Sequence, residues 1–578
     1  MKTIFSTLAL FTLLPTLILS AADSAKDIQA PSSEAATRIA WWQDAKFGLF
    51  IHWGPVSLVG TEIGWSRAGE RRGYRESGTQ IPVERYDNLY KEFNPVAYDP
   101  AEWVGIAKAA GIKYIVLTTR HHDGFSLWDT AANDYKITSP HSPYGKDIVR
   151  ALADATRAAG LRFGTYYSQP DWKNPDAFTD RHADYQAYIA QQLRELMTNY
   201  GQIDIVWFDG LGKAGSVYGA TTVNQMIREL QPKILINNRN GLPEDFDTPE
   251  QRVGTMEVIR PWETCMTIAR QWAWKPNDKM KSLDECLRIL VTTVTGGGNL
   301  LLNVGPMPDG RIEPRQVERL KQIGSWLEKN GIAIYNTRGG PWANGSWGGT
   351  THRDRTIYLH LLRPPVGGRL RLAPAPFRIT AARHLHEDRR ISYTQTDQGV
   401  IFELGQAAFK GPFSVVEISV DSPIPKGLVL GLNSGPFDDE ITFGRPCQDT
   451  ALATTSTGDI QKDGQGRWKV KSAVEATPGV TLDLGKITEV TALSAITTHK
   501  HNYGAGNVLV RAAISPDGEA WEEIGHSSYG LHRFDLPVTR FVAGIDQPGR
   551  SARYLRVWID YGDRQGTLEL GEIKVYAR

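Results

Sequence analysis

Polar side chains with catalytic potential stand where several short apolar runs of this sequence end. They are His52 in FGLFIHWG, His121 and His122 after YIVLTTR, Tyr166 in FGTYYS, Trp207 and Asp209 in IVWFDG, and Arg239 in ILINNR. A pair of carboxyl groups in a cleft with such neighbours is typical of a glycosidase, in which one acts as nucleophile or base and the other as acid. An isolated Asp at a strand end more often caps a loop or a helix. The surrounding imidazole, phenol and guanidinium groups favour a catalytic role for Asp209.

The two adjacent histidines also admit a metal site. His121 and His122, with His52 and Asp209, offer the donor atoms of a zinc or iron centre. Neighbouring residues of one strand point to opposite faces, so both imidazoles reach one ion only where the backbone is irregular. The sequence therefore favours a site without a metal or another cofactor, and a metal-dependent hydrolase is the weaker alternative.

A regular alternation of helices and strands has to position these residues. The segment 99–111 predicts a helix with Asp99 as N-cap, Pro100 at the first helical position and Glu102 three residues after the cap. The strand 113–120 follows, and the same order repeats as 146–160 with 161–168, 185–201 with 202–210, 223–232 with 233–239, and 282–294 with 296–306, before a last helix at 315–331. This alternation predicts a parallel sheet, and catalytic groups gathered from several strand ends are typical of a (β/α)8 barrel. A doubly wound nucleotide-binding sheet is less favoured, because no strand leads into a GxGxxG or Walker-type loop.

The rest of the chain has the pattern of β-structure. Beyond about residue 340, short strands such as TIYLHLL, RLRLA and FSVVEISV are separated by Gly and Pro, as in a β-sandwich. A Pro- and Gly-bearing stretch then leads to a final block of strands. We therefore predict a multidomain chain of α/β and all-β parts: a (β/α)8-like TIM barrel catalytic domain over 36–340, a β-sandwich over 341–425, and a C-terminal β module over 435–578.

Composition and charge exclude several classes of function. The 578 residues carry a formal net charge of +1, so no basic surface points to nucleic acid. The N-terminus has one Lys, an apolar run from Ile4 to Leu19 and small residues at 20–22, which is the pattern of a signal peptide over 1–22. No later segment is apolar and long enough to span a membrane. We expect a secreted or periplasmic protein after cleavage, and the three cysteines are too few for a disulfide framework or a zinc site.

Several longer motifs resemble the α-L-fucosidases of glycoside hydrolase family twenty-nine. They are FGLFIHWGPVSLVGTE, AKAAGIKYIVLTTRHHDGFSLWDT, GTYYSQPDW, IDIVWFDG, RPWETC and GGGNLLLNVGPMPDG, within roughly residues 36–345. The resemblance implies a barrel-like catalytic domain followed by a β-sandwich, and hydrolysis with retention of configuration through a covalent fucosyl-enzyme. The final module resembles a discoidin-like, coagulation-factor type C jelly roll in SPDGEAWEEIG, RYLRVWI and LGEIKVY. Modules of that kind often bind galactose-type sugars.

The resemblance also implies roles for individual residues. The nucleophile of the family matches Asp209, and its fucose-binding residues match His52, His121, His122, Tyr166, Trp207 and Arg239. Imidazoles and an Arg can hydrogen-bond ring hydroxyls, while an aromatic ring covers the apolar side around the sugar methyl. Where the family often has EWYS, this chain has TEIGWSR. Glu62 and Trp65 are therefore less direct matches for the Glu-Trp pair of the family.

The general acid/base is a choice between two glutamates. Glu250 in DFDTPEQ follows the strand that carries Arg239, and Glu263 lies a little further along in RPWETC. Both stretches resemble the family, whose members do not all take the acid from the same one. A retaining pair needs carboxyl groups ~5 to 5.5 Å apart, so only one of the two is catalytic, and the sequence favours Glu250.

The leading hypothesis is a secreted retaining exo-α-L-fucosidase that acts on fucosylated oligosaccharides or polysaccharides. A catalytically silent fucose- or glycan-binding protein with the same pocket is the main alternative, and the presence of Asp209 with a downstream Glu favours the enzyme. The RWxGNE-like signature of the branch that prefers branched α-1,3/4-fucosylated oligosaccharides is absent from the sequence, which favours broader specificity. The sequence makes no prediction of oligomeric state.

Overall fold

The structure of the chain is a computed structural model. It describes residues 33–430, apart from 69–79, 180, 211–217, 254–255, 259, 346, 363–367, 388, 398 and 406–412. Beyond residue 430 it describes the strands between 453 and 577 and the turn at 516–521. The predicted signal peptide at 1–22 lies outside the described residues.

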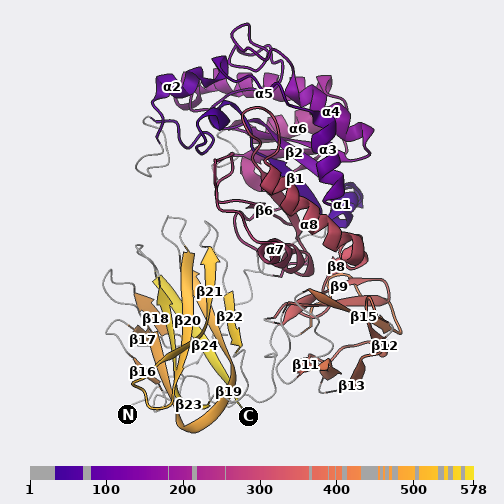
Figure 1. Cartoon of the computed structure of the whole chain (residues 1–578), viewed down its shortest axis with the longest axis vertical. Coiled ribbons are helices and arrows are strands. Elements are labelled where there is room, and N and C mark those ends of the chain that lie inside the picture. The colour runs from indigo at the N-terminus through magenta and orange to yellow at the C-terminus, as the bar shows by residue number, and fades with distance from the viewer. Residues whose placement is uncertain are drawn as a thin grey trace, which may run out of the picture.

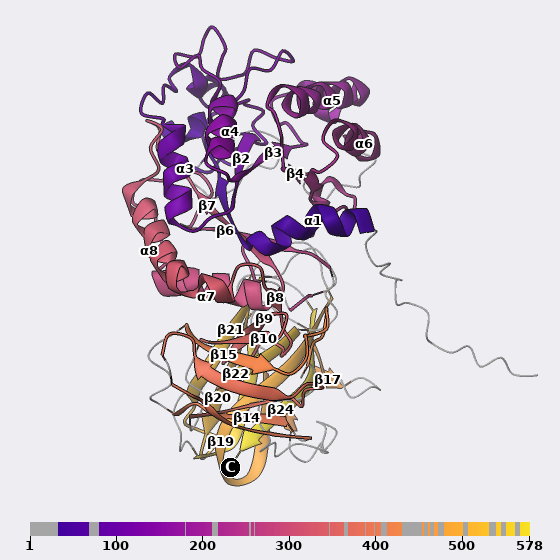
Figure 2. The same ribbon diagram turned by 90° about the vertical axis from the view of Figure 1, so that its right-hand side faces the viewer.

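A sheet of seven parallel strands forms the centre of the N-terminal half, in the order β5-β4-β3-β2-β1-β7-β6. The strands are β1 (Phe47–Ile51), β2 (Tyr114–Arg120), β3 (Arg162–Ser168), β4 (Ile205–Asp209), β5 (Leu235–Ile236), β6 (Glu263–Thr267) and β7 (Asn299–Val304). Nearly every residue in them is buried, as in a parallel sheet covered on both faces. Helices lie around the outside of this curled sheet (Figure 1 and Figure 2), as the alternation in the sequence predicts.

Several helices of the described residues begin at side-chain caps that are visible in the sequence. The helices are α1 (Ser33–Ala45), α2 (Val83–Asn88), α3 (Pro100–Ala109), α4 (Ile148–Ala158), α5 (His182–Asn199), α6 (Ala220–Leu230), α7 (Leu283–Thr295) and α8 (Pro314–Asn330), with 3-10 turns η1 (Pro55–Leu58), η2 (Leu89–Lys91), η3 (Pro175–Phe178), η5 (Asn238–Asn240) and η6 (Gly331–Ala333). Asp99 accepts hydrogen bonds from the N–H groups of Ala101 and Glu102 at the start of α3, as predicted. Ser282 and Glu285 form a capping box at the start of α7. These caps satisfy backbone donors that a helix leaves unpaired at its N-terminus.

An irregular segment closes the curled sheet. β5 and β6 stand at its two edges, and residues 245–251 lie between them with parallel bridges from Asn237 to Phe246 on one side and from Glu250 to Cys265 on the other. Pro249 has no N–H for a ladder bond, and Gln251 has a φ of 52°, so a regular eighth strand does not form here. The predicted (β/α)8-like barrel is therefore a seven-stranded TIM-like sheet with an irregular seam at 245–251.

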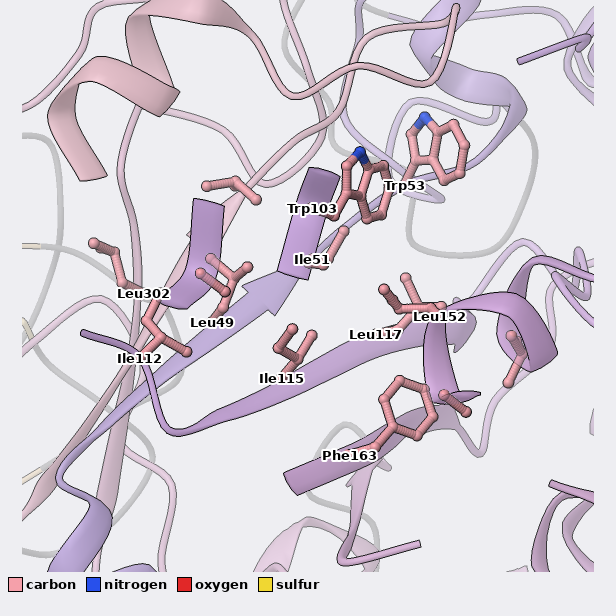
Figure 3. Close-up of a cluster of buried hydrophobic side chains, with 14 of the residues drawn as sticks. Leu49, Ile51, Trp53, Trp103, Ile112, Ile115, Leu117, Leu152, Phe163 and Leu302 are labelled. Atoms are coloured by element: carbon pink, nitrogen blue, oxygen red, sulfur yellow. The ribbon is translucent and has the colours of Figure 1, made fainter. Parts of the chain in front are cut away.

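Alternate residues of the strands face two different clusters. The outward set, shown in part in Figure 3, contains Leu49, Ile51, Ile115, Leu117 and Phe163, and it packs with Trp103 of α3 and Leu152 of α4. The inward set contains Phe50, Val116, Tyr166, Ile205 and Trp207. Because the side chains of a strand alternate with a period of two, Asp209 shares the inward orientation of Ile205 and Trp207. The register of β4 thus delivers this carboxylate to the interior of the sheet.

Three further sheets follow the barrel. Strands β8 (Arg338–Gly339), β9 (Gly348–Arg353), β10 (Thr356–Leu361), β12 (Ile379–His384) and β15 (Ser414–Val420) form one sheet, and β11 (Arg369–Leu372), β13 (Ser392–Thr396) and β14 (Gly399–Glu403) form another. Both contribute to one hydrophobic cluster, as expected of a β-sandwich. The last sheet contains β16 (Ala453–Thr455), β17 (Ile460–Lys462), β18 (Trp468–Lys471), β19 (Gly479–Lys500), β20 (Asn507–Ser515), β21 (Glu522–Gly530), β22 (Thr539–Gly544), β23 (Ser551–Asp560) and β24 (Thr567–Ala577). The C-terminal region is therefore β-structure, and its jelly-roll arrangement stays a prediction.

Candidate active site

The end of β4 is held on both sides of Asp209. β5 pairs with β4 over only two residues, and the side chain of Asn237 continues that pairing. The Phe208 N–H donates to Oδ1 of Asn237 at 2.8 Å, and Nδ2 of Asn237 donates to the Phe208 carbonyl oxygen at 2.9 Å. The N–H of Gly210 donates to the carbonyl oxygen of Arg239 at 3.0 Å. These bonds fix the backbone that presents the Asp209 carboxylate.

Three side chains surround the Asp209 carboxylate. The Tyr166 hydroxyl donates to Oδ2 at 3.0 Å, and Nη1 of Arg239 donates to Oδ1 at 3.4 Å. Nε2 of His122 lies 3.6 Å from Oδ2. Burial by itself raises the pKa of Asp209, but Arg239, His122 and Tyr166 outweigh it and lower this pKa below its ordinary value. Asp209 is therefore ionised at neutral pH, as a carboxylate nucleophile has to be.

Arg239 joins Asp209 to a second carboxylate. Its Nη1 lies 2.8 Å from Oε2 of Glu250 and 3.4 Å from Oδ1 of Asp209. Those two oxygens cannot be farther apart than the sum of the distances, which is compatible with the ~5 to 5.5 Å between the carboxyl groups of retaining glycosidases. The Thr248 hydroxyl and carbonyl oxygens accept from the guanidinium, whose carbon lies 4.8 Å from the Trp207 ring centre. The Glu250 side chain is 31% exposed and that of Asp209 is 14% exposed, so we call Asp209, Glu250 and Arg239 the mouth of the site.

The three histidines follow β1 and β2. The ring of His121 stacks on Tyr166 with centroids 5.5 Å apart, and it lies 5.6 Å from His52 and 4.3 Å from His122. His122 Nδ1 contacts Oγ of Ser168 at 2.6 Å, so its Nε2 is the atom that faces the carboxylate. Burial lowers the pKa of His52 to about 3 and lowers the pKa of His121 well below its ordinary value. These two imidazoles are therefore neutral, and each has one nitrogen that donates and one that accepts.

Glu263 lies in a different environment, on β6, a strand that the sequence reasoning did not predict. Its Oε1 accepts from Trp207 Nε1 at 3.2 Å, and its Oε2 accepts from Trp42 Nε1 at 3.2 Å and from the Tyr114 hydroxyl. The residue is fully buried, and burial raises its pKa to about 7, although the three donors act in the opposite direction. A Cβ at Gly48 would lie 2.3 Å from the Tyr114 ring, so only glycine lets this ring reach Glu263. We call Glu263, Trp42 and Tyr114 the floor of the site.

Glu62 and Trp65 have separate places. Oε2 of Glu62 accepts from the Trp272 N–H at 2.9 Å, and Oε1 accepts from the Ala273 N–H at 3.1 Å. Glu62 thus ties its own loop to the loop at 268–274. The ring of Trp65 lies edge-on to His122 at a centroid distance of 5.4 Å. Trp65 therefore adjoins the histidines, while the Glu62 carboxylate accepts hydrogen bonds from backbone N–H groups.

Several residues of the site were missed by the sequence reasoning. They are Ser168, Trp172, Asn237, Thr248, Trp272 and Asn303, which contact the predicted residues. The Trp272 ring lies 4.7 Å from that of His52, and the tryptophans of QWAWKP are the signal that would have found it. The amide and hydroxyl residues lack such a signal, because polar side chains of these types are common in loops.

The described residues contain neither a cluster of metal-binding side chains nor a membrane-spanning helix. Within the ranges given above, no group of three or more His, Cys, Asp or Glu side chains is arranged to hold a metal ion. Within the same part of the chain, no helix is both long and apolar enough to cross a membrane.

Known proteins resemble this chain in sequence and in fold. The model of the alpha-L-fucosidase family matches residues 17–332. The chain belongs to the alpha-L-fucosidase family. It is similar to the plasma alpha-L-fucosidase of Homo sapiens, with 31% identity over 410 residues that cover 65% of this chain and 87% of the relative. It is also similar to the tissue alpha-L-fucosidase of Macaca fascicularis, with 30% identity over 449 residues that cover 69% of this chain and 93% of the relative.

Solved alpha-L-fucosidase structures align with most of this chain. Alpha-L-fucosidase isoenzyme 1 from Paenibacillus thiaminolyticus has a TM-score of 0.61 and 34% identity, and the alignment covers 68% of this chain and 100% of that one. A trapped covalent intermediate of a family twenty-nine alpha-L-fucosidase from Bacteroides thetaiotaomicron, in complex with 2-fluoro-fucosyl fluoride, has a TM-score of 0.60 and 26% identity over 67% of this chain and 96% of that one. As an alpha-L-fucosidase, the chain is a glycoside hydrolase.

Proposed function

We propose that this alpha-L-fucosidase is a retaining exo-enzyme that removes terminal α-L-fucosyl groups from oligosaccharides or polysaccharides. Asp209 is the nucleophile, and Glu250 is the general acid/base. One observation carries the proposal: a single nitrogen of Arg239 contacts both carboxylates, which brings the two groups close together and supports the short separation that a retaining enzyme needs.

The first step forms a covalent fucosyl-enzyme. Asp209 attacks the anomeric carbon, and the bond from that carbon to the leaving oxygen breaks. Glu250 donates its proton to that oxygen, so the leaving sugar departs as an alcohol. The bonds from Tyr166 and Arg239 to Asp209 align the carboxylate before the attack. The product of this step is a fucosyl ester of Asp209.

The second step hydrolyses this ester. Glu250, now ionised, accepts a proton from water, and the water oxygen attacks the anomeric carbon and releases Asp209. Esterification has removed one of the two negative charges that Arg239 faces. The guanidinium then faces the Glu250 carboxylate without the competing charge of Asp209.

The rest of the site suits an uncharged sugar with one apolar side. His52 and His121 are neutral because burial lowers the pKa of each. A neutral imidazole can donate to one sugar hydroxyl and accept from another, so these residues suit an uncharged ligand. Trp207 and Trp272 supply apolar ring surface near them. Fucose has hydroxyl groups and a methyl group on its ring, and this combination of polar and apolar surface complements the site.

A catalytically silent fucose- or glycan-binding protein is the second candidate. Such a protein needs the histidines and the aromatic rings, but it has no need of two carboxylates that share one guanidinium. A Bacteroides thetaiotaomicron relative forms a trapped covalent intermediate with 2-fluoro-fucosyl fluoride. Both points support the enzyme.

The proposal is tested by trapping the nucleophile. We expect the protein to hydrolyse a chromogenic α-L-fucoside and to gain one 2-fluoro-fucosyl group from 2-fluoro-fucosyl fluoride, located by mass spectrometry on the peptide that contains Asp209. The Asp209→Ala variant loses the label, and the Glu263→Gln variant, which keeps both mouth carboxylates, retains it. A label on another residue, or a folded protein without hydrolysis, would falsify the proposal. Chelators are expected to leave the rate unchanged.

We further propose that the enzyme is exported after removal of residues 1–22 and that its C-terminal region is a jelly-roll module that binds galactose-type sugars. The apolar N-terminus and the discoidin-like motifs support these two points. Sequencing of the secreted protein from its N-terminus is expected to begin near residue 23. Galactose binding by the full-length Asp209→Ala variant tests the module, and failure to bind contradicts it.

A further inference from the structure

Asn303 connects His52 with the loop that carries Trp272, and neither of these takes part in the proposed bond-breaking steps. It lies on β7 between β1 and β6, opposite Phe50 on one side and Thr267 on the other. The residue is 1% exposed. Its Oδ1 lies 2.6 Å from Nδ1 of His52, and its Nδ2 donates to the carbonyl oxygen of Trp272 at 2.8 Å. One buried amide therefore contacts a ring of the site and the backbone of the loop beside it.

The contact with Trp272 fixes the orientation of the Asn303 side-chain amide. A carbonyl oxygen can only accept a hydrogen bond, so the amide atom that faces Trp272 is the NH2 group. The atom that faces His52 is then the amide oxygen, which also can only accept. Nδ1 of His52 therefore carries the ring proton, and Nε2 carries a lone pair. Burial, which lowers the pKa of His52 to about 3, keeps the ring in this neutral form.

The loop that carries Trp272 is held from two sides. The carbonyl oxygen of Trp272 accepts a hydrogen bond from Asn303, and the N–H groups of Trp272 and Ala273 donate to Glu62. The Trp272 ring lies 4.7 Å from the His52 ring. Asn303 therefore bonds the His52 ring and the backbone that carries the Trp272 ring, and loss of its amide removes one support from each.

We propose that Asn303 is a positioning residue that fixes His52 as a hydrogen-bond acceptor for a sugar hydroxyl and holds Trp272 beside that hydroxyl. The inference rests on the proposed function, since it assigns to this pair the recognition of one hydroxyl of the fucosyl group. A hydroxyl in that place donates its proton to Nε2. A sugar without a donor there leaves a buried nitrogen unsatisfied, and this discriminates against it.

The tautomer of His52 can be read without substrate. We expect long-range 1H–15N correlation of 15N-histidine-labelled protein at pH 7 to show an Nδ1–H tautomer for His52, assigned by comparison with His52→Phe. An Nε2–H tautomer would overturn the inference and leave the proposed reaction untouched. Conversely, if 2-fluoro-fucosyl fluoride does not label Asp209, the proposed reaction is contradicted, and this spectrum is unchanged.

The pH profile of Asn303→Asp gives a second test. The charged groups that face His52 are Asp209, which raises its pKa, and His122 and Arg239, which lower it; His121 and Tyr166 lie beside it. A carboxylate against Nδ1 favours the imidazolium, so the pKa of His52 rises by ~1 to 3 pH units. The imidazolium has no lone pair, and the acidic limb of kcat/KM therefore moves to higher pH.

A matched control lies on the same strand. Asn299 is also 1% exposed, but its Nδ2 donates to the carbonyl oxygen of Trp42 at the opposite end of β7. Asn299→Asp is expected to lower the melting temperature and to leave the acidic limb in place. A folded Asn303→Asp variant with an unshifted acidic limb, or an equal shift in Asn299→Asp, overturns the positioning role.

Discussion

At the mouth of the site, Asp209 and Glu250 share the charged guanidinium of Arg239, whereas at the floor Glu263 receives only neutral donors. Trp207 separates the two places. Its ring lies 4.8 Å from the guanidinium carbon, and its Nε1 donates to Glu263 at 3.2 Å. Glutamate thus occurs in two environments within one short stretch of chain: Glu250 lies beside a charged guanidinium, and Glu263 lies among neutral donors.

The two environments give the carboxyl groups opposite properties. A charged partner lowers the pKa of Asp209 below its ordinary value, while desolvation raises the pKa of Glu263 to about 7. Glu250 is 31% exposed, whereas Glu263 is fully buried among aromatic rings. A group that exchanges protons with a leaving sugar and with water has to be reachable. The comparison therefore supports the proposed chemistry at the mouth and a structural role for the floor.

The largest effect is expected from removal of the nucleophile. Asp209→Ala should lower kcat by on the order of 10^4 to 10^6, because no other group can form the fucosyl ester. Added azide should attack an activated fucoside directly and give the β-fucosyl azide, since the covalent step is bypassed. The azide product is identified by NMR. Near-normal turnover by this variant, with an unchanged circular dichroism spectrum, contradicts the role of Asp209.

The next largest effect separates Glu250 from Glu263. Glu250→Ala should lower the rate on a fucosylated oligosaccharide by ~10^2 to 10^4 and affect an activated aryl fucoside much less, because only the poor leaving group needs a proton. Azide should now accelerate release and give the α-fucosyl azide, since it attacks the covalent intermediate. If Glu263→Ala shows this pattern and Glu250→Ala does not, the two roles have to be exchanged.

A smaller effect is expected from the floor. In Glu263→Gln the amide nitrogen has to face at least one of the donors from Trp42, Tyr114 and Trp207. An unsatisfied buried donor costs about 1 to 3 kcal/mol of unfolding free energy, which denaturant titration measures. Any loss of activity should be equal for aryl and sugar leaving groups and insensitive to azide. A leaving-group dependence would instead place Glu263 at the reacting bond.

The sequence predicts the helices and strands that position the site better than it predicts the contacts between the site residues. The helix at Asp99 and the strand that ends at Asp209 follow from a local cap and a local apolar run. β6 was missed, because RPWETC is short and carries a Pro and a buried Glu that break the pattern of a strand. The contact between Arg239 and Glu250 depends on the irregular segment 245–251, which has no periodicity to read.

Glu62 shows that a sequence motif can identify a residue without identifying its binding partner. Its position near Trp65 suggests a sugar contact, but its carboxylate accepts hydrogen bonds from the backbone of the Trp272 loop. That loop lies about two hundred residues away in the sequence, so only the tertiary structure reveals the contact. The local sequence identifies the residue type, and the distant loop determines what the residue binds.

The smallest effect concerns stability against pH. The pKa of Glu263 rises from 4.5 to about 7 on folding, so its favourable contribution is fully present below about 4.5 and is lost as the pH rises through about 7. Asp209 has the opposite sign, because its lowered pKa adds stability above its ordinary pKa. The free energy of unfolding should therefore fall less between pH 5 and pH 7 in Glu263→Gln than in the unaltered protein. Glu62→Gln is the matched comparison, because the pKa of Glu62 is also raised to about 7, and equal slopes in all three proteins contradict the prediction.

The irregular segment 245–251 has a consequence for how such an enzyme can diverge. Asp209, the proposed nucleophile, is part of a regular strand whose register tolerates no insertion, whereas Glu250 is carried by a stretch that bridges two sheet edges through isolated contacts. Insertions and deletions in that stretch move the proton donor without disturbing the strand that bears the nucleophile. Over evolutionary time, the choice of leaving group can change while the sugar that is cleaved off stays the same, and exchange of this one stretch between homologues offers a route to new glycan linkages.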